Sequence, residues 1–421
     1  MPAAILESRA KLDFWVGFAF FRDPWVSAPS STTARDGLGP LFNAHSCIAC
    51  HVVGGRGDSP RADAATPAVI LKVGAVGDAT GNPHPYYGHQ LQTRGTANSA
   101  RPEMAGEAQL RINYEPRKYV LRDGSELALA APQYRLAPPT DRSLPTGGDA
   151  YSPRIAPPLF GLGLLEAIPT ARLRELADPN DANGDGISGR IRWLSAAPGD
   201  APQVGRFGWK STHASVAQQT ATAFAEDMGI TSALFASEPC AAMGQLPCEG
   251  PSAGDDPHEG VEITAGLFDR VVHFVSHLAP PAPPPPAADV VRGEGVFARL
   301  GCDGCHTPSH LVATATHWSG LRALETIWPY TDLLLHDMGP GLASDLPEEG
   351  AAGAEWRTPA LWGLGANLAA NPDAGLLHDG RARTVPEAIA WHGGEGEQAA
   401  QAFLSLNRYE RDALVAFIKA L

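Results

Sequence analysis

Two copies of the pattern Cys-x-x-Cys-His constrain this chain more than any other feature, one at residues 47–51 and one at residues 302–306. The pattern is typical of a c-type haem attachment site, in which two thiols bond to the haem vinyl groups and the adjacent histidine ligates the iron. From the chain's own Cys and His frequencies, about 0.003 matches would be expected by accident. The sequence therefore predicts two covalently bound haem c groups and a redox function. The predicted attachment residues are Cys47, Cys50, His51, Cys302, Cys305 and His306.

Length and charge narrow the class of protein further. A chain of 421 residues is long enough for two or three domains with sizeable cores. Its formal net charge of −14 argues against nucleic-acid binding. An acidic surface instead favours a basic or dipolar partner, such as a small redox protein that donates or accepts electrons. No apolar run of about 18 residues occurs, so we expect no transmembrane segment.

The cysteines outside the two motifs bear on the cellular compartment. Cys240 and Cys248 lie in a stretch punctuated by Pro and Gly, and we interpret them as a disulfide that closes a small loop. Two buried free thiols are the alternative. A disulfide and c-type haems both favour an oxidising compartment. The first ten residues include Glu7 and Arg9, and no signal peptide is visible. We therefore expect an exported, periplasmic protein whose signal peptide is not in this sequence.

A proline-rich run predicts the main boundary of the chain. Residues 280–286 read Pro-Pro-Ala-Pro-Pro-Pro-Pro, which cannot be helical and favours a stiff, extended linker. The spacing of apolar residues predicts a helix before it, over about 264–278, and another at the C-terminus that Asn407 caps. The predicted organisation is an N-terminal haem domain over 1–279, a linker over 280–288 and a C-terminal cytochrome c-like haem domain over 289–421.

One segment has strand character. Leu110, Ile112 and Tyr114 alternate with polar residues, and Asp123-Gly124 is a hairpin turn signal. Glycine (45 residues) and proline (38 residues) are abundant, as expected where backbone wraps a haem instead of forming regular elements. The predicted fold is therefore mainly α: two cytochrome c-like haem domains, rich in loops, with a single small β insertion over about 105–150 in the N-terminal domain.

Several phrases of the sequence resemble the bacterial di-haem c-type oxidoreductases, a family also described as thiol oxidoreductases or peroxidases. More distantly, the chain is similar to the di-haem cytochrome c peroxidases and to the di-haem maturase of methylamine dehydrogenase. That resemblance implies one haem that stores and passes electrons and a second haem with an open face for peroxide. The matching phrases are residues 37–43, 162–169, 205–210, 227–231, 329–339, 355–359 and 377–382.

The resemblance implies a sixth ligand for the C-terminal haem. The peroxidases carry a His-Asp-Gly phrase, here residues 378–380, and fourteen residues later a distal ligand that is usually Met. This chain has His392 there, so we predict that His306 and His392 ligate this iron. A second imidazole in place of a thioether predicts a low-spin, low-potential haem. Met338 or His336 is the alternative ligand, and a histidine that only hydrogen-bonds in the core is the plainer interpretation.

The resemblance also implies residues of a peroxide pocket. Trp209 matches a Trp that lies between the haems, and Gln219, ten residues later, matches a Gln of the pocket. In the peroxidases a Glu moves a proton between the peroxide oxygens; Asp227 takes its place here, with Glu226 beside it. Glu103 is a rival acid. Core packing for Trp209 and a solvated helix end for the carboxylates are the plainer alternatives.

The sixth ligand of the N-terminal haem is left open by the sequence. The peroxidases often have a removable distal His shortly after the first motif, and His84 and His89 lie in such a place. Lys210 is another group that could reach the iron. We predict an open or exchangeable coordination position.

A short loop has the first half of a calcium-binding pattern. Asp181, Asn183 and Asp185 stand at positions 1, 3 and 5, and the carbonyl of Ile187 stands at position 7. Position 12 is Arg192, not the usual Glu, so Ca²⁺ would need another carboxylate, such as Asp178. The loop is therefore a possible structural calcium site, and a loop of Asx turns is the alternative.

Two functions fit these observations. The first is a peroxidase-like oxidoreductase, in which electrons enter at the C-terminal haem and hydrogen peroxide or a similar small oxidant is reduced at the N-terminal haem. The second is a non-catalytic di-haem electron-transfer protein. A maturase that oxidises residues of another protein is a third possibility. Thiol chemistry has little support, because no cysteine pair remains beyond Cys240 and Cys248.

Overall fold

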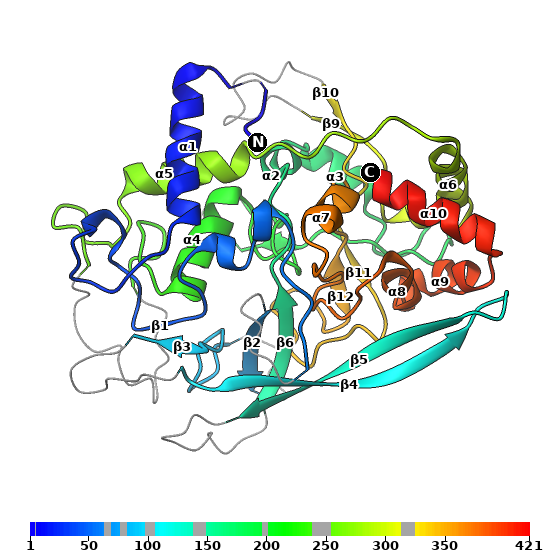
Figure 1. Cartoon of the computed structure of the whole chain (residues 1–421), viewed down its shortest axis with the longest axis horizontal. Helices are drawn as coiled ribbons and strands as arrows, with labels where there is room; N and C mark the ends of the chain where they lie inside the picture. Colours follow the sequence, from blue (N-terminus) through cyan, green and yellow to red (C-terminus); the bar gives the residue numbers. More distant parts are fainter. Residues whose placement is uncertain are drawn as a thin grey trace.

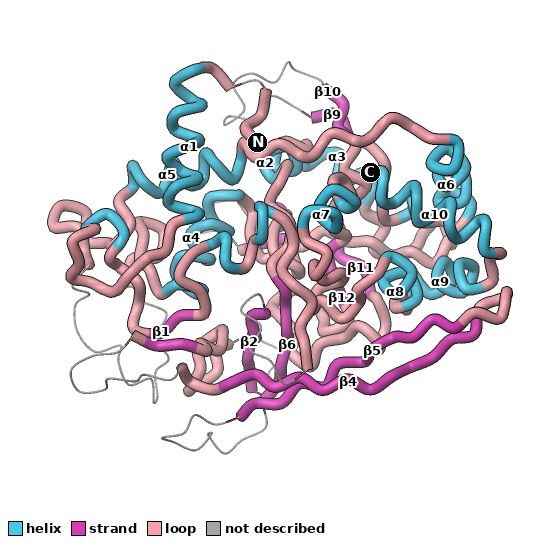
Figure 2. Tube along the Cα trace, viewed as in Figure 1, coloured by secondary structure: helices cyan, strands magenta, loops and turns pink. Residues whose placement is uncertain are grey.

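The computed structural model describes most of the chain, shown from N- to C-terminus in Figure 1. Loops make up much of the tube in Figure 2, with helices and strands between them. The described residues are 1–4, 6–62, 69–75, 82–96, 106–137, 149–195, 201–237, 254–312 and 325–421.

The α-helices of the described ranges form two groups (Figure 1). The first comprises α1 (Ser8–Arg22), α2 (Leu162–Glu166), α3 (Thr170–Leu176), α4 (Val216–Met228) and α5 (Ala265–Ser276). The second comprises α6 (Ala288–Arg299), α7 (Leu364–Ala370), α8 (Val385–Ala390), α9 (Glu397–Leu404) and α10 (Arg408–Ala420). Each haem motif opens with one turn of 3₁₀-helix, Cys47–Ala49 in the first group and Cys302–Gly304 in the second.

A glycine permits the close crossing of one helix pair in each group. A Cβ atom on Gly17 of α1 would lie 1.9 Å from the Arg270 carbonyl oxygen of α5. A Cβ atom on Gly293 of α6 would lie 2.0 Å from the Ala413 carbonyl oxygen of α10. In both groups the haem motif follows the helix that carries this glycine, so the crossing places the motif against the core.

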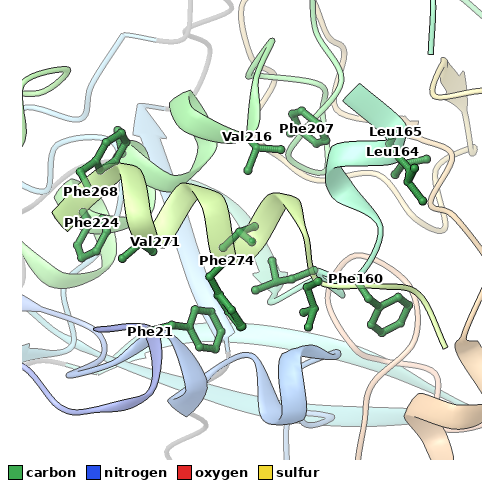
Figure 3. Packing of buried hydrophobic residues seen from close by; sticks show 14 of the residues in the cluster. Phe21, Phe160, Leu164, Leu165, Phe207, Val216, Phe224, Phe268, Val271 and Phe274 are labelled. Atoms are coloured by element: carbon green, nitrogen blue, oxygen red, sulfur yellow. The ribbon is translucent and has the colours of Figure 1, made fainter. Parts of the chain in front are cut away.

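The larger core surrounds α5. Phe274 of α5 packs on Phe21 of α1, with ring centroids 5.0 Å apart, and Phe268 packs near Phe224 of α4 at 6.4 Å (Figure 3). Apolar residues recur along α5 at helical spacing, and those that face α1, α2 and α4 are buried. Cys47 packs against this cluster, so the first motif sits at its edge.

The prediction of a mainly α fold with one β insertion is wrong. The described strands pair into six antiparallel two-stranded sheets that are scattered along the chain. Most are too short to show a period of two in the sequence, because tertiary contacts and not local propensity hold them in place. The strands are β1 (Leu41–Phe42), β2 (Val69–Ala75), β3 (Arg94–Gly95), β4 (Gln109–Val120), β5 (Glu126–Ala137), β6 (Asp149–Ile155), β7 (Trp193–Leu194), β8 (Gln203–Val204), β9 (His310–Val312), β10 (Glu325–Ile327), β11 (Leu335–Asp337) and β12 (Glu355–Arg357).

The longest sheet is the hairpin β4–β5, which lies within the segment predicted to carry strands. It turns at residues 121–125, where Gly124 has φ +81°. The hairpin extends beneath α8 and α9 (Figure 1). Leu129 and Ala131 of β5 are buried in the core of the C-terminal helices, and Asp123 pairs with Arg411 of α10. A segment from the first half of the sequence thus braces the second half.

The proline-rich segment joins the two helix groups. Helix α5 ends at Ser276 and α6 begins at Ala288, with no helix between them. The predicted C-terminal helix is α10, and Asn407 caps it by accepting a hydrogen bond from the Glu410 amide at 3.0 Å. The proposed domain boundaries stay a prediction. Among the helices of the described ranges, none combines the length and the apolar character that a membrane span requires.

Candidate active site

The first haem motif lines a cavity of about 470 Å³, a size typical of small-molecule and cofactor sites. His51 donates a hydrogen bond from Nδ1 to the Pro157 carbonyl at 2.8 Å, which leaves Nε2 as the ligating nitrogen. Burial lowers the pKa of His51 to about 4, so the imidazole is neutral, as metal ligation requires. Two thiols and a neutral imidazole on one cavity wall fit a covalently attached haem.

The second motif repeats this arrangement. His306 donates from Nδ1 to the Tyr330 carbonyl at 3.0 Å. His392, just after α8, donates from Nδ1 to the Ala388 carbonyl at 2.7 Å and is likewise oriented through its backbone bond. Burial lowers the pKa of His306 to about 4, so this imidazole is neutral as well. His392 as the sixth ligand of this iron stays a prediction.

The two alternative ligands of this iron differ in their surroundings. His336 is buried between two carboxylates, with Nε2 2.8 Å from Asp332 and Nδ1 2.6 Å from Glu395. Both ring nitrogens are thus engaged, and none is left for iron. Met338 lies beside His392: a Cβ atom on Gly396 would be 3.1 Å from the His392 Cβ and 3.3 Å from the Met338 Cε.

The cavity brings together Trp209, Gln219, Glu226 and Asp227, which the resemblance implied for the peroxide pocket. Helix α4 supplies three of them, because Gln219 and Glu226 are seven residues apart on one helical face and Asp227 follows directly. Ser215 caps the start of α4, where its side chain accepts a hydrogen bond from the Gln218 amide. Gly229, with a φ of +64°, ends the helix. The cavity-lining set is Cys47, Cys50, His51, Trp209, Gln219, Glu226 and Asp227.

Gln219 has an unsatisfied acceptor in this cavity. Its side-chain Oε1 is buried and has no hydrogen-bond partner among the described residues. A buried polar atom without a partner is costly, so the site favours a ligand or water that can donate a hydrogen bond.

The environments of the neighbouring carboxyl groups of Glu226 and Asp227 shift their pKa values in opposite directions. Burial alone would raise the pKa of Glu226, but the ammonium of Lys72, which bonds to it directly, outweighs burial and lowers that pKa. Burial raises the pKa of Asp227 to about 6, although it accepts a 2.7 Å hydrogen bond from Gln90 Nε2. Environments that separate two pKa values in this way are typical of acid–base sites.

Lys72 and Gln90 are functional candidates that the sequence did not reveal. Lys72 lies on β2 and Gln90 in the segment after it, both far in sequence from α4. His89 also lines the cavity. His84 does not: its Nδ1 accepts the backbone amides of Tyr86 and Tyr87.

Lys210, the other candidate iron ligand, is directed elsewhere. Its ammonium donates to the carbonyls of Ala352, Gly353 and Glu355 at 2.6–3.0 Å, and the side chain is fully buried. Burial lowers the pKa of Lys210 to about 7, and the three carbonyls give its amine a structural role.

Trp209 connects the cavity to the second helix group. Its indole Nε1 donates to the Ile155 carbonyl at 2.8 Å. Trp209, Ile155 and Trp356 belong to one buried cluster, and Met338, which lies beside His392, packs against it. The cluster is therefore a continuous packed connection between the cavity and the surroundings of the second motif.

The predicted calcium loop is compact and exposed. Asp181, Asn183 and Asp185 accept hydrogen bonds from backbone amides inside the loop, and Asp178 accepts those of residues 182 and 183. Over the described residues no group of three or more His, Cys, Asp or Glu is arranged to hold a metal ion. Calcium at this loop, including the Ile187 carbonyl, stays a prediction. Cys240, Cys248 and Glu103 lie outside the described residues.

Comparisons with known proteins bear on the chain as a whole. The family described as "Di-haem oxidoreductase, putative peroxidase" matches residues 77–421, a range that includes the second motif and begins after the first. Among solved structures, a hydrazine synthase of Kuenenia stuttgartiensis aligns with 100% of this chain and 93% of its own, at 12% identity and a TM-score of 0.35. A similarity at that TM-score supports no argument about fold or function. The curated proteins give no match.

Proposed function

The chain belongs to the di-haem oxidoreductase family, and on that premise we propose that it is a periplasmic peroxidase-like enzyme. Hydrogen peroxide, or a similar small oxidant, would be reduced in the cavity beside His51. The electrons would come from a small redox protein through the C-terminal haem. Two motifs of the c-type pattern support covalent haem attachment and hence an exported protein.

The residues that would hold the haems are those of the two motifs. When bound, the haem supplies a redox-active iron that accepts electrons and polarises the bound oxidant. His51 and His306 would ligate the two irons through Nε2, and His392 would complete the coordination at the second. The cysteines of each motif would fix the porphyrin covalently.

One observation carries the catalytic part of the proposal: Gln219 lines the same cavity as the first motif, and its buried Oε1 has no partner among the described residues. A carbonyl oxygen accepts hydrogen bonds and cannot donate them. The O–H groups of hydrogen peroxide supply such a donor. Gln219 would therefore orient the oxidant in the cavity.

Reduction of hydrogen peroxide to two waters consumes two electrons and two protons, so the site needs a group that moves protons. Asp227, with a pKa of about 6, can accept a proton from one peroxide oxygen near neutral pH and return it to the other. Glu226 stays ionised beside Lys72 and would supply fixed negative charge. Trp209 would shorten the path by which electrons reach the cavity.

Two measurements test this proposal against a non-catalytic electron carrier. In the enzyme, the reduced protein binds carbon monoxide at one haem, and rapid mixing with hydrogen peroxide oxidises both haems. In an electron carrier, both irons stay six-coordinate, carbon monoxide does not bind, and peroxide reacts slowly or not at all. If neither iron binds carbon monoxide, the enzymatic function is therefore refuted.

A further inference from the structure

A second glutamine of the cavity has an unpaired acceptor. Gln90 lines the cavity of the first motif, its side chain is only 3% exposed, and its Oε1 is buried with no hydrogen-bond partner. Gln219 is the one other cavity-lining residue of the described ranges with a buried side-chain polar atom in this state. Because such an atom is costly, Gln90 offers a place for a donor that the protein itself does not fill.

The other end of the Gln90 side chain fixes which atom is free. Its Nε2 donates to the Asp227 carboxylate at 2.7 Å and to the Glu226 carbonyl at 3.1 Å. A backbone carbonyl can only accept a hydrogen bond, so the amide atom that faces it must be the nitrogen. Oε1 is therefore the free end. Since both atoms belong to one planar amide, a donor bound at Oε1 has the Asp227 carboxyl group as a near neighbour.

Strand pairing places Gln90 at this position. Gln90 forms an antiparallel β-bridge with Lys72 of β2, and residues paired in this way present their side chains on the same face. Lys72 bonds to the Glu226 carboxylate, and Gln90 bonds to Asp227. The pair therefore gives each carboxyl group of α4 its own partner, a cation for Glu226 and a neutral amide for Asp227.

Gln90 and Gln219 serve different positions in the cavity. Gln219 precedes Asp227 by eight residues on α4, which is about 12 Å along the helix axis. Gln90 contacts Asp227 directly. Of the two free acceptors, the one on Gln90 is thus the one beside the group assigned to proton transfer.

We propose that Gln90 determines specificity and selects an oxidant with an O–H group on each oxygen, as in hydrogen peroxide. One O–H donates to Gln90 Oε1, and Asp227 takes the proton of the other. As the O–O bond breaks, Asp227 returns this proton to the first oxygen. Two electrons from the redox partner and one further proton from solvent complete two waters. The inference rests on the proposed function and adds to it the class of oxidant.

An alkyl hydroperoxide lacks one of the two O–H groups. Its single O–H is used in the proton transfer, and an alkyl carbon stands where hydrogen peroxide has its second hydrogen. Gln90 Oε1 then stays buried without a partner. A site that is built to bind an O–H group discriminates for this reason against an analogue without it.

The test compares hydrogen peroxide with methyl hydroperoxide in rapid mixing with the haem-loaded protein. Gln90→Leu removes both the donor and the acceptor. We expect the rate constant for hydrogen peroxide to fall about tenfold relative to that for methyl hydroperoxide, the effect of one lost hydrogen bond. If Gln90 only held Asp227 in place, both rate constants would fall equally, because both oxidants need that proton transfer. The ratio of the two rate constants therefore separates contact with the oxidant from positioning of Asp227.

Gln92 provides a matched control on the same segment. Its Nε2 donates to the same Glu226 carbonyl at 2.6 Å, but its Oε1 accepts a hydrogen bond from Asn43 Nδ2 at 2.9 Å. Gln92 does not line the cavity. Gln92→Leu should therefore keep the wild-type ratio of the two rate constants, whatever it does to stability.

The outcomes distinguish this inference from the proposed function. A wild-type protein with two haems that reduces neither oxidant contradicts the proposed function, and the inference falls with it. A wild-type protein that reacts, with an unchanged ratio in Gln90→Leu, overturns the inference alone, since Oε1 would then serve a bound water. If Gln90→Leu does not fold, Gln90→Lys decides. Lysine keeps a donor for Asp227 and the Glu226 carbonyl but has no acceptor, so the ratio must fall there too.

Discussion

Trp356 stacks on His378 with ring centroids 3.7 Å apart and planes inclined by 10°. The ammonium of Lys210 lies 4.0 Å from the same Trp ring centroid. Two groups so close to the ring centre must occupy opposite faces, so the indole is enclosed between an imidazole and the Lys210 amine. Its Nε1 donates to the Leu342 carbonyl at 2.9 Å, and this contact fixes the ring in its plane.

This packing predicts a strong dependence of stability on Trp356. Trp356→Ala should lower the free energy of unfolding by about 3–5 kcal/mol, since it removes a buried aromatic side chain. Trp356→Phe keeps a ring on His378 and loses one hydrogen bond, for a smaller loss of about 1 kcal/mol. Denaturant unfolding of the haem-loaded protein measures both. Trp328→Ala, at a Trp that is 59% exposed, is the control and should change little.

Removal of the predicted acid–base group should slow the reaction with peroxide. Asp227→Asn keeps the shape of the side chain but cannot accept a proton, so the second-order rate constant should fall by about 10²–10⁴-fold. Rapid-mixing kinetics measure it at a fixed degree of haem loading. Glu175→Gln, at a carboxylate on α3 that is 64% exposed, should leave the rate unchanged. A rate in Asp227→Asn equal to that of wild type would exclude Asp227 from proton transfer.

The same group predicts the pH profile. Burial raises the pKa of Asp227 to about 6, so the carboxylate is protonated and inactive as a base below that pH. The peroxide rate should therefore rise as pH increases through about 6, and this limb should vanish in Asp227→Asn. Lys72→Met removes the cation that holds the pKa of Glu226 down, so Glu226 should then titrate at higher pH. A profile that is flat between pH 5 and 7 would contradict this assignment.

His336 should make stability depend on pH in the opposite direction from an ordinary carboxylate. Burial alone would lower its pKa, but Asp332 and Glu395 outweigh burial and raise it well above 6.5. Its contribution is then fully present below the unfolded value of about 6.5 and is lost as pH rises through the folded pKa. His336→Gln should cost about 3–5 kcal/mol at pH 6 and less in alkaline solution. Arg408→Gln, at an exposed ion pair, provides the comparison.

The sixth ligand of the C-terminal haem can be identified by a matched pair of substitutions. If His392 ligates the iron, His392→Met replaces imidazole by thioether and should raise the midpoint potential of that haem. Met338→Leu should then leave the potential and the spectrum unchanged. The reverse pattern, with an effect at Met338 and none at His392, would assign the ligand to Met338. Spectroelectrochemistry measures both variants.

The sequence predicted those parts of the site that depend on local spacing. The two pentapeptides each form one turn. Gln219, Glu226 and Asp227, which the resemblance to the peroxidases implied, line one cavity because a single helix carries them. In the same way, the Asn407 cap and the α10 helix follow from neighbouring residues.

The features of the site and of the fold that were not predicted depend on contacts between segments that are distant in the sequence. Lys72 of β2 bonds to Glu226 of α4, 154 residues away in the sequence, and no local pattern encodes that contact. The short sheets were missed for the same reason: strands of two or three residues are stabilised by what they pack on, and their sequences look like loop. The hairpin was predicted as a small insertion, because the alternation of apolar and polar residues in a strand does not indicate which other elements the strand packs against.

The hairpin β4–β5 has a consequence for how the polypeptide holds together. Its residues are encoded before α4 and α5, yet Tyr134 donates to Asp379 at 2.6 Å and Arg117 lies over the Trp391 ring at 5.3 Å. A protease nick within the proline segment would therefore not release two independent fragments. The C-terminal part of the protein would stay bound to the β4–β5 hairpin, which is synthesised before it.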